Sequence, residues 1–269
     1  MNNPTRRAFL KSSLAATAAT TLAAAGLSAA ASPATPAGRD YYELRAYRLK
    51  PGAPTALLDA YLEKALLPAL NARGISPVGV FTEIDVKDSA VWVLIPHRSL
   101  ESVVSVNAAL NADPAVQQAG AEYLSGPTKT QPAFDRIDSW LLLAFAGLPR
   151  LEVPATTKAR QPRIFEMRMY ESFSELKALK KVEMFNAGEI GAMKEVGLAP
   201  VFYGQALTGP NLPHLTYMTS GPDMDTHKQH WTAFGTHPVW VKLKNDPQYA
   251  DTVSKITKRF LKPAGYSQI

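Results

Sequence analysis

The sequence contains no cysteine. This absence excludes disulfide bonds, thiol catalysis and any metal or iron–sulfur centre that depends on cysteine ligands. The sequence also lacks a glycine-rich phosphate loop, a dinucleotide-binding fingerprint, a Gly-x-Ser-x-Gly elbow and a His-Glu-x-x-His motif. These absences disfavour ATPases, nicotinamide dehydrogenases of the usual type, elbow-class serine hydrolases and zinc proteases of that signature.

The sequence also lacks a strong excess of positive or negative charge. The formal net charge of the 269 residues is +6, from 29 basic and 23 acidic side chains. Arg6, Arg7 and Lys11 lie in an N-terminal segment without acidic residues that we expect to be removed, which leaves 29 − 3 − 23 = +3. The remaining basic residues form no run, so we do not expect a nucleic-acid partner.

The N-terminal segment has the order of a secretory peptide. An arginine pair is followed by an apolar stretch over 12–27 that is rich in alanine and threonine, and then by small residues at 29–31. We interpret residues 1–32 as a twin-arginine signal peptide, read by the twin-arginine export machinery, which exports folded proteins. The mature protein is then periplasmic or secreted.

The alternative is that this segment stays as a transmembrane helix. Its alanine and threonine content makes insertion marginal compared with a leucine-rich span. Nothing later in the sequence approaches 18 uninterrupted apolar residues. We therefore expect no stable membrane span after signal cleavage.

The rest of the chain contains an internal repeat. Two segments recur at an offset of 123 residues and in the same order: 42–47 in 165–170, and 74–78 in 197–201. We match Asp113-Pro114 with Asp246-Pro247, which implies a longer middle part in the second copy. A stretch with three prolines then serves as the linker. The resulting division is a first domain over 40–147, a linker over 148–162 and a second domain over 163–269.

Each copy shows the periodicity of a small α/β unit. The first copy predicts strands over 41–49, 77–84, 90–95 and 134–145, and helices over 53–73 and 100–124. The second predicts strands over 163–171, 199–207, 214–220 and 256–263, and helices over 174–196 and 223–258. The order β-α-β-β-α-β is that of a ferredoxin-like unit.

Several motifs resemble the NIPSNAP family: ELRAY at 43–47, EMRMY at 166–170, WTAFGTHPVW at 231–240, KNDP at 244–247 and LKP at 261–263. The resemblance covers about 41–145 and 163–266, and is weaker in the first copy, where 102–112 lacks the aromatic residues. It implies an α+β fold in which two ferredoxin-like units form a pseudo-dimeric α/β barrel. The family has no well-established chemistry, so the resemblance implies a fold rather than a reaction.

The first strand of each copy separates polar from apolar side chains, because alternate residues lie on opposite faces. We expect the apolar face to meet the helices and the polar face to point into the barrel. The polar groups then either form a structural ladder of ion pairs or line a pocket. In a pocket, arginine would bind an anionic or carbonyl group while glutamate or tyrosine handles a proton. These residues are Glu43, Arg45 and Tyr47 in the first copy, and Glu166, Arg168 and Tyr170 in the second.

Histidines are concentrated in the second copy. His227 and His230 are one helical turn apart, with Asp223 and Asp225 nearby. Two histidines are too few for a metal site, so we expect a solvent-exposed pair and no bound metal. His237 precedes a proline, which turns the chain out of a helix. Its imidazole then either caps a backbone group or enters the pocket.

The aromatic residues Trp231, Phe234 and Trp240 have helical spacing, and such residues usually pack in a core or interface. They could also wall a ligand cavity. Our leading hypothesis is a protein that binds a small apolar or anionic molecule in the barrel between its domains. The alternatives are a cofactor-independent oxygenase or isomerase, and a scaffold for protein interactions. The ligand-binding candidates are Glu43, Arg45, Tyr47, Glu166, Arg168, Tyr170, Trp231, Phe234 and His237.

For the enzyme alternative, the catalytic candidates are His237, Glu166, Arg168 and Tyr170. There Arg168 would stabilise an enolate oxygen while His237 or Glu166 moves a proton. We predict no cofactor. The oligomeric state stays open, a homo-oligomer included.

Overall fold

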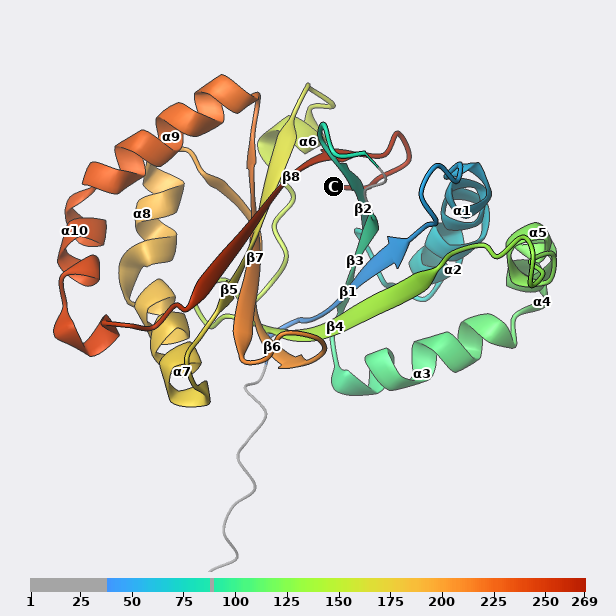
Figure 1. Cartoon of the computed structure of the whole chain (residues 1–269), viewed down its shortest axis with the longest axis horizontal. Coiled ribbons are helices and arrows are strands. Elements are labelled where there is room, and N and C mark those ends of the chain that lie inside the picture. The colour runs from blue at the N-terminus through green and yellow to red at the C-terminus, as the bar shows by residue number, and fades with distance from the viewer. Residues whose placement is uncertain (1–37, 88–89) are drawn as a thin grey trace, which may run out of the picture. The chain divides into compact units, whose positions relative to one another are not determined.

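Eight antiparallel strands close into one barrel in the computed structural model, which describes residues 38–87 and 90–269 (Figure 1). The predicted signal peptide, 1–32, lies outside the described residues. The strands are β1 (Tyr41–Arg48), β2 (Gly79–Glu83), β3 (Val91–His97), β4 (Arg136–Ala144), β5 (Ile164–Glu171), β6 (Ala199–Thr208), β7 (His214–Gly221) and β8 (Lys255–Pro263). Their order around the barrel is β1-β3-β2-β8-β5-β7-β6-β4.

Each copy supplies four neighbouring strands in the ferredoxin-like order, β4-β1-β3-β2 in the first and β8-β5-β7-β6 in the second. The two sheets join where β2 pairs with β8 and where β4 pairs with β6. Each junction therefore combines the second strand of one copy with the last strand of the other. Closure leaves no sheet edge free. The predicted α+β fold with a pseudo-dimeric barrel is confirmed.

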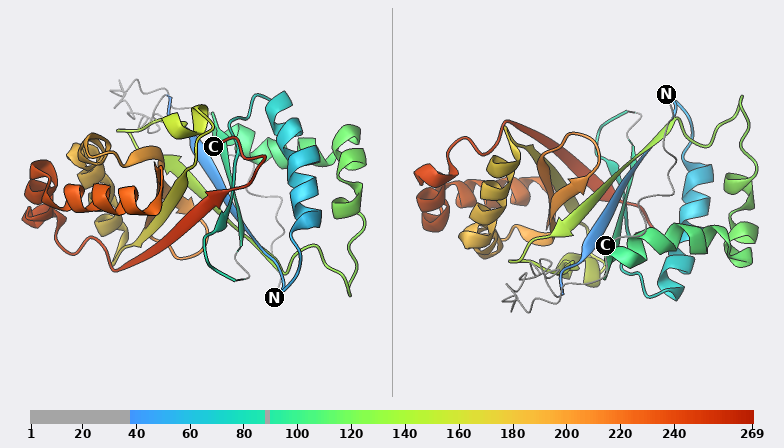
Figure 2. Two further views of the ribbon diagram at one scale, coloured as in Figure 1. Left: turned by 90° about the horizontal axis from the view of Figure 1, so that it is seen from above. Right: turned by 90° about the horizontal axis from the view of Figure 1, so that it is seen from below.

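The helices cover the outside of the barrel. Those of the first copy are α1 (Ala56–Tyr61), η1 (Leu62–Leu66), α2 (Leu67–Ala72), α3 (Leu100–Asn111), α4 (Pro114–Ala119) and α5 (Ala121–Leu124). Those of the second are α7 (Glu175–Met184), η2 (Phe185–Glu189), α8 (Ile190–Glu195), α9 (Met224–Thr236), α10 (Pro238–Lys244) and η3 (Pro247–Tyr249). The two groups lie on opposite sides of the strands (Figures 1 and 2). The short helix α6 (Ala155–Lys158) lies within the predicted linker.

The first helix of each copy contains a π-helical turn, η1 or η2, and the two turns start 123 residues apart (185 − 62). In the first copy the turn precedes Pro68, which has no N–H to donate to the helix. In the second copy it contains Gly188, whose φ of 144° is open to glycine but unfavourable for other residues. Because both turns fall at the repeat offset, residues of the two helices can be compared position by position.

The barrel interior is filled by apolar side chains of both copies. Tyr42 contacts Phe202 with ring centroids 5.1 Å apart, and Phe81 contacts Phe165 at 5.0 Å. Each of these pairs joins one copy to the other. One continuous buried cluster includes Tyr42, Leu44, Ala46, Trp92, Trp140, Phe165, Met167, Met169, Phe202, Met218 and Leu261. The interior is therefore a packed core.

The expected direction of the first strands was wrong. Their apolar face points into the barrel, and the Glu-Arg-Tyr face points outward to the helices, where Tyr47 and Tyr170 belong to the helix-side clusters. The period of two fixes which side chains share a face but not which face is inward. The interior between two sheets needs large apolar side chains, whereas helix side chains can pair with the charged groups.

The second correction concerns the repeat. Helix α4 begins at Pro114 after the N-cap Asp113, and α10 begins at Pro238 after the N-cap His237. These helices follow α3 and α9, so Asp113 corresponds to His237 at an offset of 124 (237 − 113). Asp246-Pro247 instead starts η3. The prediction that the second copy has a longer middle part was therefore wrong. An N-cap followed by proline begins many helices, so the Asp-Pro match was not diagnostic.

Candidate functional site

The arginine of the first strand has the same two intrastrand partners in both copies. Nε of Arg168 donates to Oε1 of Glu166 at 2.7 Å, and Nη1 donates to the hydroxyl of Tyr170 at 3.4 Å. In the first copy Arg45 makes the corresponding bonds to Glu43 at 2.6 Å and to Tyr47 at 3.3 Å. Both arginines are thus held by their own strands.

Glu166 is the centre of a buried network in the second copy. Its Oε2 accepts hydrogen bonds from Nε2 of His227 at 2.8 Å and from Nε1 of Trp231. Burial alone would raise the pKa of Glu166, but the bond from His227 and the charge of Arg168 outweigh it and lower the pKa. Glu166 is therefore an ionised anchor for Arg168, with both oxygens engaged.

His227 is buried, with 1% exposure, so the expectation of a solvent-exposed histidine pair was wrong for this residue. It lies on the inner face of α9, where Glu166 supplies the partner that makes its burial favourable. His230 is partly exposed and packs against Gly197. The sequence signal for the Glu166–His227 pair is weak, because 61 residues separate the partners.

Trp231 lies over the guanidinium of Arg168. The ring centroid is 3.5 Å from Cζ, which is cation–π contact. Among the described residues, none accepts a hydrogen bond from Nη2 of Arg168. Arg168 lines a pocket, so this N–H group is available to a bound molecule.

The pocket has a volume of about 350 Å³ and lies between the second-copy sheet and its helices, outside the barrel. It brings together four of the predicted ligand-binding residues, Arg168, Tyr170, Trp231 and Phe234. The other lining residues are Lys181, Glu189, Gly235, Trp240, Val253 and Ile256. The predicted location in the barrel between the domains was therefore wrong, since that space is filled.

A buried ion pair forms the polar floor of this pocket. Nζ of Lys181, on α7, lies 2.8 Å from Oε2 of Glu189, at the end of η2, and both side chains are almost completely buried. Burial raises the pKa of Glu189, and the nearby charges of Lys181 and Arg168 offset this only in part. Neither residue of the pair was among the sequence candidates.

The first copy shows what the same positions look like without a pocket. At the offset of 123, Lys181 corresponds to Leu58 and Glu189 to Leu66, both buried in an apolar cluster. Counted from the helix N-caps Ser99 and Asp223, Trp231 corresponds to Asn107. The free N–H of Arg45 is taken up there, because Nη2 donates to Oδ1 of Asn107 at 2.9 Å.

Aromatic side chains complete the filling of the first copy. Phe134 packs edge-on against Tyr47 with centroids 6.4 Å apart, and Tyr123 of α5 packs against Phe134 at the same distance. The first-copy triad Glu43, Arg45 and Tyr47 is thus a structural ladder enclosed by helix side chains. Of the two interpretations of the repeated motif, the first copy fits the structural one. In the second copy Arg168 and Tyr170 line a pocket, whereas Glu166 is not part of its lining.

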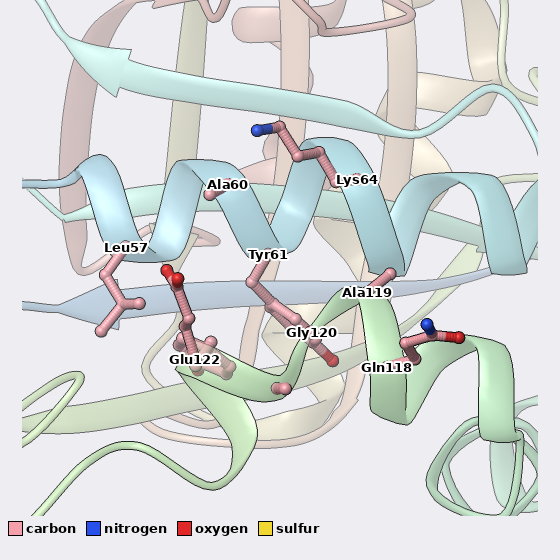
Figure 3. Close-up of a pocket in the computed structure, with 10 residues that line it drawn as sticks. Leu57, Ala60, Tyr61, Lys64, Gln118, Ala119, Gly120 and Glu122 are labelled. Carbon is pink, nitrogen blue, oxygen red and sulfur yellow. The ribbon is translucent and has the colours of Figure 1, made fainter.

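A groove of about 340 Å³ does occur in the first copy, between α1–η1 and α4–α5 (Figure 3). Leu57 and Tyr61 point toward the α4–α5 segment, whereas Lys64 points away from it. The charged lining residues Lys64 and Glu122 are exposed. The charged groups of this groove therefore lie in solvent, unlike the buried Lys181–Glu189 pair of the second-copy pocket.

His237 lies outside the pocket. Its Nδ1 accepts a hydrogen bond from the backbone N–H of Val239 at 3.3 Å, and its Nε2 lies 3.0 Å from Glu195. It is the N-cap of α10. Of the two expectations for this histidine, the structure shows the backbone cap.

Glu43 should make the stability of the protein depend on pH. Burial would raise its pKa, but the His97 ring and the Arg45 guanidinium outweigh burial and lower the pKa to about 2. A lowered pKa stabilises the fold above the unfolded value of about 4.3 and loses that effect as pH falls toward 2. We expect Glu43→Gln to be less stable than the natural chain by about 3 kcal/mol at pH 7, and by progressively less below pH 4.5.

Urea unfolding of both chains between pH 7 and pH 2.5 measures this difference. Subtracting the two curves cancels the carboxylates that they share. A difference in unfolding free energy that stays constant across this range would contradict the assigned role of Glu43.

In 38–87 and 90–269, no group of three or more His, Asp or Glu side chains is arranged to hold a metal ion. No helix of these same segments has the length and apolar character that crossing a bilayer requires.

Comparison with known proteins gives a family and a fold. The model of the NIPSNAP family matches residues 42–131 and 165–268, together more than half of the chain. No curated protein matches the chain. The solved structures similar to it include an uncharacterized NIPSNAP-like domain protein from Burkholderia xenovorans, with a TM-score of 0.35, 17% identity, and coverage of 39% of this chain and 88% of that one.

Two solved structures match most of the chain. One is the "putative monooxygenase" of Fusobacterium nucleatum, with a TM-score of 0.54 and 9% identity over 84% of this chain and 93% of that one. The other is the "putative monooxygenase" of Lactobacillus acidophilus, with a TM-score of 0.56 and 7% identity over 84% and 94%. At these identities the similarity shows a common fold.

Proposed function

Because the chain belongs to the NIPSNAP family, a membership that fixes the fold but no reaction, we propose its function from the pocket of the second copy. There it binds a flat, largely apolar small molecule that carries an anionic or carbonyl oxygen. The observation that carries the proposal is that Arg168 lines an aromatic-walled cavity and that no described residue accepts a hydrogen bond from its Nη2.

The walls and the charges of the pocket favour the same kind of ligand. Trp231, Phe234 and Trp240 offer ring faces to a flat molecule. Arg168 and Lys181 supply two cations, whereas Glu189 is the one acidic residue of the lining. Because Glu166 lies 2.7 Å from Arg168 and balances its charge, a ligand oxygen is favoured by the N–H groups of Arg168 rather than by an excess of positive charge.

Calorimetric titration with benzoylformate tests the proposal, because this probe joins a phenyl ring to a 2-keto carboxylate. We expect binding to the full chain, and a loss of about 10- to 150-fold in affinity for Arg168→Met, as expected when a hydrogen bond to a charged group is removed. The matched control is Arg45→Met, which breaks the same intrastrand bonds in the first copy, where Asn107 and apolar side chains fill the corresponding positions. It should bind the probe as the natural chain does.

Equal loss in both arginine variants would show that the motif acts only through folding. Absence of binding to the natural chain would remove the proposed function.

A second candidate is a cofactor-independent oxygenase or isomerase. The fold shared with two proteins described as monooxygenases supports it by analogy, which is a weak warrant for function. The presence of Glu189, an acid with a raised pKa, in the pocket is the specific observation in its favour. We do not expect His237 or Glu166 to move the proton in this reaction. His237 lies outside the pocket, and both carboxylate oxygens of Glu166 already accept hydrogen bonds.

The scaffold interpretation has an observation of its own. Phe173 and Leu176, at the start of α7, are 69% and 68% exposed. A groove beside them is lined by Leu179, Leu207 and Leu212, among others. Exposed apolar groups of this kind occur at interaction surfaces. They do not indicate the chemistry of a partner, whereas the charged and aromatic lining of the pocket indicates a class of ligand.

A further inference from the structure

We propose that Glu189 is a catalytic base that removes a proton from a carbon atom next to a carbonyl group, while Arg168 holds the carbonyl oxygen. The activity is the enolisation of an aryl-substituted carbonyl compound. This inference rests on the proposed binding function, because the same pocket must first hold the carbonyl compound.

The first argument is that the fold does not need charges at these positions. Leu58 and Leu66 occupy the corresponding places of the first copy and are buried in its helix-side core. A buried ion pair is often no more stabilising than apolar residues of similar size. The presence of Lys181 and Glu189 in only one copy, and at the wall of a pocket, therefore indicates a role in the chemistry of that pocket.

The second argument is the position of the carboxylate. Oε2 of Glu189 bonds to Lys181, and no described residue donates a hydrogen bond to Oε1. Oε1 is thus the atom that can accept a proton from a bound molecule. The carboxylate belongs to the last residue of the π-helical turn η2.

The third argument is the partner of the base. Arg168 lines the same cavity and interacts electrostatically with Glu189. Tyr170, another residue of the lining, is fixed by a 2.9 Å hydrogen bond between its hydroxyl and that of Tyr217. A carbonyl oxygen at Nη2 of Arg168 would place the neighbouring carbon inside the cavity that Glu189 also lines.

The proposed step balances without a co-reactant. The C–H bond breaks, its proton passes to Oε1 of Glu189, and its electron pair forms the C=C bond. The carbonyl π electrons move to the oxygen, whose negative charge is stabilised by the Arg168 guanidinium. Return of the proton to carbon regenerates the ketone, and protonation of the oxygen gives the enol. The ammonium group of Lys181, 2.8 Å from Oε2, favours the ionised form of the carboxylate that accepts the proton.

The pocket also limits the class of substrate. A volume of about 350 Å³ suits a molecule of one or two rings. Trp231, Phe234 and Trp240 favour an aryl group, and Arg168, Lys181 and Glu189 supply the charged groups of the same lining. The expected substrates are aryl-substituted ketones or 2-keto acids with at least one hydrogen on the carbon beside the carbonyl.

The test follows exchange of the benzylic hydrogens of phenylpyruvate in deuterated water by proton NMR. We expect the full chain to accelerate exchange over buffer, and Glu189→Gln to lose about 10²- to 10⁴-fold of that acceleration, as is typical of general bases. The double variant Lys181→Leu with Glu189→Leu reproduces the first-copy arrangement and should lose the same activity. Glu183→Gln, an exposed carboxylate on α7 that pairs with Lys180, should retain it.

Benzoylformate, which has no hydrogen on the corresponding carbon, separates the two proposals. If it binds but phenylpyruvate exchanges no faster than in buffer, the catalytic inference is overturned and the binding function stands. If benzoylformate does not bind, the binding function itself fails. Exchange that survives in the folded double variant would also overturn the role of Glu189.

Discussion

Replacing Lys181 and Glu189 together by leucine is expected to leave the free energy of unfolding unchanged, or to raise it by about 1–4 kcal/mol. Either single replacement is expected to lower it by about 3–5 kcal/mol. The difference arises because a single change leaves one buried charge without its partner 2.8 Å away. The double change instead recreates the apolar pair Leu58 and Leu66 of the first copy.

Urea unfolding of the three variants and the natural chain, followed by circular dichroism, measures these effects. The coupling between the two positions comes from the double-mutant cycle and should be several kcal/mol in favour of the double change. Additive losses, with the double variant less stable than either single one, would contradict the comparison of the two copies. That result would mean that the second-copy helices need the ion pair for their own packing.

The second large effect is expected in the barrel. Phe165→Ala should lower the free energy of unfolding by about 3–5 kcal/mol, because the ring is fully buried against Phe81 and its removal leaves a cavity. Phe173→Ala removes the same side chain eight residues later, where it is 69% exposed. That change should stay within about 0.5 kcal/mol.

The two phenylalanine variants form a matched pair for chemical unfolding at one pH. If Phe165→Ala were as mild as Phe173→Ala, the barrel interior would have to be loosely filled. A hollow interior of that kind would reopen the space between the copies as a binding site.

The architecture could be predicted because it depends on periodicity, and periodicity is a local property. Alternation over 41–49 and 163–171 and the helical pattern between them placed every strand of the barrel to within a few residues. The recurrence of one motif 123 residues later then indicated two equivalent units. That the two units form one barrel came with the family resemblance, and the strand edges that join them came only from the structure.

The inward direction of the strands could not be predicted in the same way. Both faces of β1 and β5 are buried, so alternation separates two sets of side chains without saying which set faces the barrel. Glu166 is satisfied by His227 and Trp231, which come from α9 and lie more than 60 residues away. The outward position of the charged set depends on these long-range partners.

The central ion pair was also overlooked, although the sequence contains a signal for it. Lys181 and Glu189 take helix positions that hold leucine in the first copy, Leu58 and Leu66. At these aligned positions one copy has a charged residue and the other an apolar residue. Packing alone therefore does not determine the residue type there. Comparing the copies residue by residue, rather than motif by motif, would have found the pair.

The joining of β2 to β8 and of β4 to β6 has a consequence for how such a protein can change over evolutionary time. In an assembly of two identical chains, every substitution appears on both sides at once. Fusion of the halves into one polypeptide lifts that symmetry while the shared barrel keeps them together. One helix layer can then remain an apolar clamp, and the other is free to accept costly polar groups.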